Sequence, residues 1–196
     1  MRFFPPTVFL IAVAVHAGPL SFDSEKIIVR LVALDTIEVS GTYVFSHSAR
    51  KPRTYPVFYP FPVDSTMMYP CSVSVAQGDS AVEFTAHKRG NGIRIPAAFE
   101  RGQAACTLTV FYRQHVESGK GRYILTTTSR WNKPLRHAAF EVQIPAGMLL
   151  TYMSYKCDST VRTDSITTHH FQRKNFQPER DLDLSWRRIP SSGRRY

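Results

Sequence analysis

Apolar and polar residues alternate with a period of two along most of this chain. Gly and Pro turns interrupt the alternation at intervals of roughly 8–12 residues, which is typical of an antiparallel β-sandwich. No apolar stripe with a period of 3.6 residues is long enough to predict a helix. We therefore predict an all-β fold, an antiparallel β-sandwich in a single domain, with strands over 27–34, 36–45, 72–77, 81–87, 93–95, 104–115, 123–131, 138–144 and 148–155.

The pattern changes after residue 157. We assign 18–157 to the β-sandwich domain and interpret 158–189 as a polar crossover followed by a return strand. In that strand Leu182, Leu184 and Trp186 share one face. Residues 190–196 are polar and basic, and they predict a disordered tail.

The first residues indicate where the protein works. Arg2 is the single charge in residues 1–17, an apolar run extends from Val8 to Val15, and small residues flank His16. This layout is typical of a secretory signal peptide. The run is about half of the roughly 20 residues that span a bilayer, so we expect no transmembrane span after signal removal. We expect a secreted or periplasmic protein that begins near Gly18.

Charge makes this a basic protein. The formal net charge is +10, and the predicted signal contributes one Arg and no acid, which leaves about +9 for the mature chain. A basic surface attracts polyanions such as anionic lipid headgroups or acidic polysaccharide. Because the chain is expected outside the cytoplasm, we do not predict nucleic acid as its partner. The alternative is that the charge only keeps the protein soluble.

Three cysteines in an exported chain permit at most one internal disulfide. Cys106 shares a predicted strand face with Leu108 and Val110 and is expected to be buried. Cys71 and Cys157 flank strand-like segments and form a possible disulfide, although connectivity cannot be deduced from sequence. None of the three lies in a setting that would create a catalytic thiol.

The segment 55–64 combines aromatic residues with closely spaced prolines. Proline cannot donate to a strand ladder, so the segment predicts an edge strand or an extended polyproline-like stretch. Its aromatics either cover the open end of the core or form an exposed binding strip with neighbouring basic residues. For the second case the candidate binding residues are Tyr55, Phe58, Tyr59, Phe61, Arg50, Lys51 and Arg53.

Catalytic and metal-binding motifs of the common kinds are missing from the sequence. We find no Gly-x-Ser-x-Gly elbow, phosphate-binding loop, His-Glu-x-x-His helix or Cys-x-x-Cys pair. Adjacent His169 and His170 would point to opposite faces of a strand, and Asp181 and Asp183 fit a solvated edge paired with nearby arginines. We therefore predict no catalytic residues, no metal site and no cofactor.

A series of short phrases resembles the VIT (inter-alpha-trypsin inhibitor) domain, and is similar to related secreted bacterial domains of unknown function. They are a strand with a central Gly at 39–43, a Tyr-Pro-Phe-Pro phrase at 59–64, a strand ending in Gly at 73–78, a long strand at 107–112, Gly-Arg-Tyr at 121–123 and a strand ending in Pro at 140–145. Between residues 78 and 102 the chain departs from that layout. The resemblance implies a β-sandwich that mediates interactions, with no catalytic residues to carry over.

Three functions remain open. The first is a non-catalytic interaction or structural module whose partner is a protein or a cell-envelope component. The second is a binder of polysaccharide, anionic glycan or lipid through the aromatic and basic edge. The third is a hydrolase with a site assembled from distant residues such as His115, His137, Asp158 and Asp164.

Overall fold

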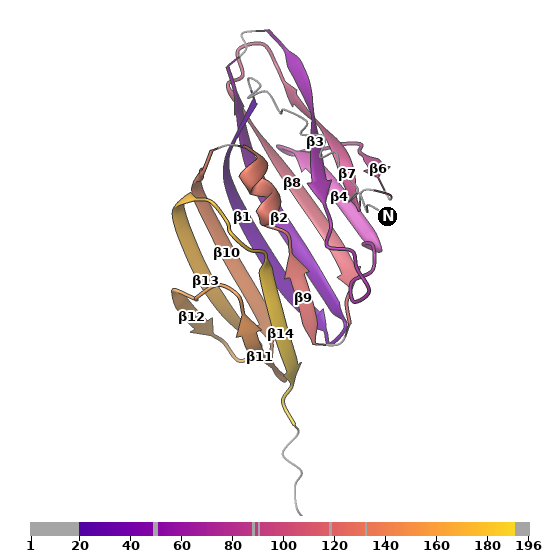
Figure 1. The fold of residues 1–196 in the computed structure, drawn as a ribbon, viewed down its shortest axis with the longest axis vertical. Coiled ribbons are helices and arrows are strands. Elements are labelled where there is room, and N and C mark those ends of the chain that lie inside the picture. The colour runs from indigo at the N-terminus through magenta and orange to yellow at the C-terminus, as the bar shows by residue number, and fades with distance from the viewer. Residues whose placement is uncertain are drawn as a thin grey trace, which may run out of the picture.

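The computed structural model describes residues 20–48, 51–87, 89, 91–117, 119–131 and 133–190, without the side chain of Arg130. The predicted signal peptide 1–17, Arg50 and residues 191–196 of the predicted tail lie outside these ranges. The described chain is nearly all β and contains no α-helix (Figure 1). It also contains no helix of the length and apolar character that crossing a membrane requires.

The strands follow one another closely, and a 3-10 helix, η2, precedes β10. Their bounds are β1 Leu20–Ala33, β2 Thr36–His47, β3 Arg53–Pro60, β4 Ser72–Gln77, β5 Ser80–Ala81, β6 Thr85–His87, β7 Gly92–Phe99, β8 Ala105–His115, β9 Lys120–Tyr123, η2 Thr126–Trp131, β10 Leu135–Pro145, β11 Met148–Met153, β12 Ser159–Arg162, β13 Ile166–Phe176 and β14 Leu182–Arg188.

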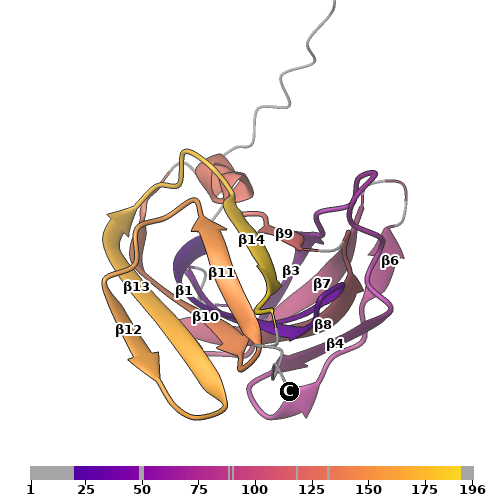
Figure 2. The same ribbon diagram turned by 90° about the horizontal axis from the view of Figure 1, so that it is seen from below.

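Three sheets make up the fold. The large sheet has the order β12-β13-β10-β1-β2-β8-β4-β5, and its neighbours are antiparallel except for the parallel pair β1–β10. The two small sheets have the orders β11-β14-β9 and β3-β7-β6. Both small sheets lie on the same side of the curved large sheet (Figure 2).

The core lies between the large sheet and the two small ones. Every second side chain is buried over 25–31 of β1, 37–47 of β2, 106–114 of β8 and 138–144 of β10, as the period-two pattern predicts for a sheet with one covered face. Ile27, Val39, Val110 and Val142 are 0% exposed and represent this inward face. All three sheets contribute to the same hydrophobic cluster.

The predicted strand over 123–131 is wrong beyond its first residue. β9 ends at Tyr123, and residues 126–131 form η2. Asp181 provides the reason, because its Oδ1 accepts hydrogen bonds from the backbone N–H groups of Leu125 and Thr126, at 3.0 Å each, and from the Thr126 hydroxyl at 2.9 Å. Such side-chain capping favours the start of a helical turn.

The interpretation of 158–189 as a crossover with one return strand also needs correction. β12 and β13 lie in this segment, and β13 pairs with β10 along most of its length. Only Phe171 and Phe176 are buried in β13. The period-two signal is therefore absent from the sequence, although the hydrogen-bonded ladder is long. The return strand appears as β14, with Leu182, Leu184 and Trp186 buried.

The cysteines do not form the disulfide considered from the sequence. Cys71, Cys106 and Cys157 are all free thiols. Cys71 precedes β4 and Cys157 precedes β12, and these strands lie near opposite ends of the large sheet with β13, β10, β1, β2 and β8 between them. This separation far exceeds the Cα distance of about 7 Å that a disulfide can bridge.

We expect the three thiols to react at very different rates. Cys106 is 4% exposed, and burial raises its pKa to about 11, whereas Cys71 is exposed. Since the thiolate is the reactive form, native protein at pH 8 should label rapidly at Cys71 and label at Cys106 only after unfolding. Peptide mass spectrometry after timed alkylation measures this, with denatured protein as the control in which all three react. Rapid native labelling of Cys106 would contradict the register of β8.

Candidate binding site

β3 divides the aromatic residues of the predicted strip between two faces. Tyr55 and Tyr59 point into the core together with Val57, and Phe61 beyond the strand is 1% exposed. Phe58 alone of the four candidate aromatics points outward, with 41% of its surface exposed. β3 is an edge strand, as the prolines predict, but its aromatics do not form one exposed strip.

Of the described candidate basic residues, Arg53 is the first residue of β3 and Lys51 precedes the strand. The Arg53 guanidinium stacks over the Tyr55 ring at 5.2 Å, and Lys51 is exposed. Arg50 lies outside the described residues. The structure therefore brings Arg53 and Tyr55 together and places Phe58 near His87, with ring centroids 5.9 Å apart.

The prolines of β3 occupy positions whose backbone groups do not form hydrogen bonds with β7. Phe61 N–H donates to the Asn91 carbonyl at 2.7 Å, so the odd-numbered positions of this segment form the hydrogen-bonded pairs with β7. Pro56 and Pro60 therefore direct their backbones to the free edge, where a missing N–H costs nothing. This edge cannot readily accept another strand, because half of its donors are missing.

The free edge of β3 borders a seam, which we define as the junction between β3 and the β9–η2 segment. Three tyrosine hydroxyls bridge the seam on its core side. The Tyr43 hydroxyl on β2 lies 2.8 Å from that of Tyr59 on β3 and 2.8 Å from that of Tyr123 on β9. All three residues are buried, so each hydrogen bond joins two different sheets in a nonpolar setting.

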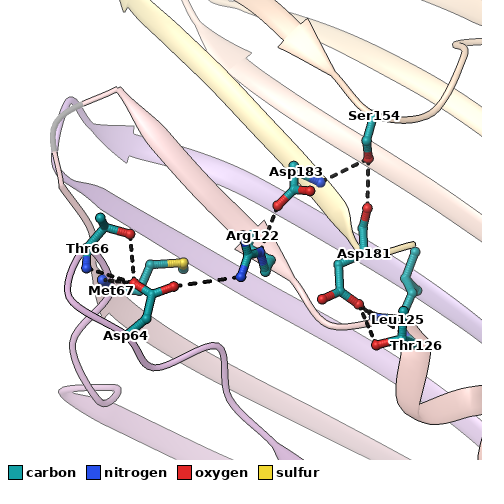
Figure 3. A network of polar contacts seen from close by, with 9 residues as sticks. All are labelled: Asp64, Thr66, Met67, Arg122, Leu125, Thr126, Ser154, Asp181 and Asp183. Carbon is teal, nitrogen blue, oxygen red and sulfur yellow. Dashed lines mark hydrogen bonds and ion pairs between the residues drawn. The ribbon is translucent and has the colours of Figure 1, made fainter. Parts of the chain in front are cut away.

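A second set of polar contacts holds the rim of the seam (Figure 3). Arg122 on β9 forms ion pairs with Asp64 after β3, at 3.7 Å, and with Asp183 on β14, at 2.7 Å. Hydrogen bonds from the Thr66 hydroxyl and backbone lower the pKa of Asp64, and the hydrogen bond to Asp183 raises the pKa of Arg122. Ser154 links the backbones of Asp181 and Asp183. This network ties β9 and β14 to the loop after β3.

A cavity lies in the seam, next to the three tyrosines. Its volume is about 60 Å³. The described lining is predominantly aromatic and aliphatic and comes from β1, β2, β3, β7, β8, β9 and η2 with the residue Ile124 that lies between β9 and η2. The rings in it belong to Phe22, Tyr43, Phe45, Tyr59, Tyr123 and Trp131, whereas Phe58, whose side chain points outward, borders the cavity from the edge of β3.

Glu25 on β1 is the one charged residue in the described lining of this cavity. Its side chain is on the core face, 4% exposed, and its Oε1 has no hydrogen-bond partner. Burial raises the pKa of Glu25 from 4.5 to about 8. A buried carboxyl oxygen without a hydrogen-bond partner lowers the stability of the fold, and such a group calls for a functional or structural explanation.

Sequence reasoning missed Glu25, although a signal was present. Glu25 has the same parity as Ile27, Val29 and Leu31, which all face the core. An acidic residue at a core position of an alternating strand predicts a buried carboxyl. Burial also raises the pKa of Tyr43, Tyr59 and Tyr123, so these hydroxyls stay protonated at neutral pH.

Gly41 leaves the space that the Tyr43 ring occupies. A Cβ at this position would overlap that ring. We expect Gly41→Ala to displace Tyr43, disrupt its hydroxyl contacts with Tyr59 and Tyr123, and lower the free energy of unfolding by about 2 kcal/mol. Urea unfolding checks this, with Ser40→Ala on the opposite face as a control that changes stability by less than about 0.5 kcal/mol. Equal effects of the two substitutions would show that the Tyr43 ring can move away from a Cβ at position 41 without loss of stability.

The four residues considered for a hydrolase are not brought together. His115 lies opposite Thr36 at one end of the large sheet, and His137 lies opposite Ser24 toward the other end. Asp158 is paired with Arg173 at 2.9 Å, and Asp164 lies in the turn between β12 and β13. The described residues also contain no group of three His, Cys, Asp or Glu side chains placed to hold a metal ion.

Residues 97–184, which extend from β7 into β14, match a family described as a domain of unknown function (DUF4424). No curated protein matches the sequence. The match covers the cavity only in part, because Glu25, Tyr43 and Tyr59 precede it. None of these comparisons bears on the resemblance to the VIT domain, which stays a prediction.

The fold is similar to that of two solved structures. A protein from Legionella pneumophila, named as a candidate nutrient binding protein, shares 14% identity with a TM-score of 0.66 over 88% of this chain and 68% of that one. An M1 zinc metallopeptidase from Deinococcus radiodurans shares 10% identity with a TM-score of 0.52, over 85% of this chain and 42% of that one. This chain thus spans less than half of the metallopeptidase. At such identities the likeness shows the fold alone.

Proposed function

We propose that this protein is a secreted or periplasmic, non-catalytic binding module, a single-domain β-sandwich whose seam cavity receives a small ligand. The cavity with the unpartnered Glu25 carboxyl is the observation that carries the proposal. Concave, mostly apolar sites with a few placed polar groups are the usual form of small-molecule sites. The layout of residues 1–17 supports export.

Two further observations support binding over catalysis. The protein from Legionella pneumophila that shares the fold is named for nutrient binding. In the described lining, Glu25 has no second acid, base or nucleophile beside it, apart from tyrosine and threonine hydroxyls. General acid–base and covalent catalysis need such a partner within hydrogen-bond reach.

Filling the cavity tests this proposal. Thr127 on η2 lines the cavity and is half-buried, so Thr127→Phe should occupy its mouth. A panel of small charged and neutral compounds is screened by thermal shift, since a ligand at one hundred times its Kd stabilises by about 2.7 kcal/mol. We expect Thr127→Phe to abolish the shifts. Ser129→Phe, on the exposed side of the same helix, should retain them. Shifts that persist in Thr127→Phe would place binding elsewhere.

A second candidate function uses the outward face of the β3-β7-β6 sheet. Exposed Phe58 lies opposite Arg94 and beside His87, next to an open hollow of about 450 Å³ lined in part by Phe84 and Pro96. Aromatic and basic groups together suit anionic glycans and lipid headgroups. Under this alternative, Phe58→Ala and Arg94→Ala weaken binding to an acidic polysaccharide or to phosphatidylglycerol vesicles. Retained binding in both variants would exclude this face.

A further inference from the structure

The aromatic rings on one side of the cavity form a packed cluster. The ring centroids of Phe22, Phe45 and Trp131 lie 5.0 to 5.8 Å from one another. Tyr43 adds a further ring at 6.1 Å from Phe22. The faces of aromatic rings carry negative potential, so a ring face of this cluster that borders the cavity would attract a cation that has left water.

The polar side chains of the described cavity lining are the Glu25 carboxyl and hydroxyls of tyrosine and threonine. Glu25 contributes a carboxyl with one oxygen that has no partner. The register of β3 directs the carbonyls of Phe58 and Pro60 away from β7, to the edge that borders the cavity, and Pro60 has no N–H to offset its carbonyl. No Lys, Arg or His lies in the described lining. An anion would therefore find no cationic side chain in the described lining.

From these features we infer that the seam cavity binds a small organic cation, with its ammonium group beside the Glu25 carboxylate and against the rings of Phe22, Phe45 and Trp131. This inference rests on the proposed function and specifies the chemical class of the ligand. The cavity volume of about 60 Å³ admits only a small head group, so the remainder of a longer ligand would extend beyond the cavity. Net positive charge elsewhere on the protein does not attract such a ligand, so selectivity depends on this cavity.

Protonation of Glu25 should regulate the site. Burial raises the pKa of Glu25 to about 8, so this carboxyl is protonated in most molecules at pH 7. A bound cation favours the ionised form. The titratable groups around Glu25 are the hydroxyls of Tyr43, Tyr59, Tyr112 and Tyr123. Burial raises the pKa of each, so none of them ionises in the pH range in which Glu25 does. A permanently charged ligand should therefore bind about tenfold more tightly at pH 9 than at pH 7.

Calorimetric titration of the purified protein with tetramethylammonium tests the inference. Neopentyl alcohol serves as the neutral probe of similar shape, and sodium chloride controls for ionic strength. We expect saturable binding of tetramethylammonium at least about tenfold tighter than that of the alcohol. Glu25→Gln should weaken tetramethylammonium binding by about tenfold or more and remove its pH dependence. Glu100→Gln, the same change at an exposed carboxyl, should leave both unchanged.

The outcomes separate the two levels of the proposal. Equal affinity of the wild-type protein for the cation and the alcohol overturns the inference but retains a binding cavity. Unchanged cation binding in Glu25→Gln also overturns it. The comparison of the two probes on wild-type protein needs no variant, so it holds even if Glu25→Gln fails to fold. Absence of saturable binding for both probes overturns the inference, and if the thermal-shift panel is also negative, it overturns the proposed function.

Discussion

Tyr59→Ala is expected to lower the free energy of unfolding by about 3–5 kcal/mol. The Tyr59 side chain is 8% exposed, its ring packs against Tyr43 and Phe61 with centroids 5.5 Å from each, and its hydroxyl contacts that of Tyr43 at 2.8 Å. Its removal leaves a cavity in the core and disrupts the hydroxyl bridge across the seam. Urea or guanidinium unfolding monitored by circular dichroism measures the change.

Phe58→Ala provides the matched control for that experiment. Phe58 is the preceding residue on the same strand, equally aromatic, but 41% exposed on the outward face. We expect its truncation to cost less than about 1 kcal/mol. A larger loss for Phe58→Ala than for Tyr59→Ala would show that β3 is displaced by one residue, because such a slip exchanges the two faces of a strand.

Glu25 should make the stability of the protein fall as pH rises. Burial raises the pKa of Glu25 from 4.5 to about 8, so between these values the native state holds a proton that the unfolded chain has released. The stabilising contribution of the protonated carboxyl is therefore complete below about pH 4.5 and is lost as pH rises through about 8. In this window the free energy of unfolding should decline by up to about 1.4 kcal/mol per pH unit.

Unfolding measurements at pH 5, 6, 7 and 8 on wild-type protein and Glu25→Gln isolate this effect. Glutamine keeps the size of the side chain and cannot ionise, so the variant should gain stability relative to wild type as pH rises, by several kcal/mol in total. Glu100→Gln is the control for the loss of one surface charge. Parallel pH profiles for wild type and Glu25→Gln would mean that Glu25 reaches solvent or a partner in the native state.

Much of the fold can be predicted from the sequence, and the exceptions have physical causes. The alternation in β2 and β8 is regular because each strand buries one face and exposes the other. β13 lacks this signal, since most of its side chains are only half-buried near the end of the large sheet. η2 could not be predicted locally, because its start depends on Asp181, a residue more than fifty positions away.

The candidate site was predicted only in part. The proline-rich segment drew attention to β3, and Tyr59 does line the cavity, but it does so from the inner face. Which face is buried depends on the partner sheet, and no local pattern of four aromatics and three prolines determines it. Phe22, Glu25 and Trp131 come from distant parts of the chain and meet only when the sheets pack together.

A crystal of the protein soaked with tetramethylarsonium would show directly whether the seam cavity binds a cation. This ion is a heavy-atom analogue of tetramethylammonium, and the anomalous scattering of arsenic locates it without reference to the protein model. We predict an anomalous peak in the seam cavity, in contact with the Glu25 carboxylate and the rings of Phe22, Phe45 and Trp131, and loss of that peak in Glu25→Gln. Ordered water in the cavity, with anomalous peaks only at other surfaces, would contradict it.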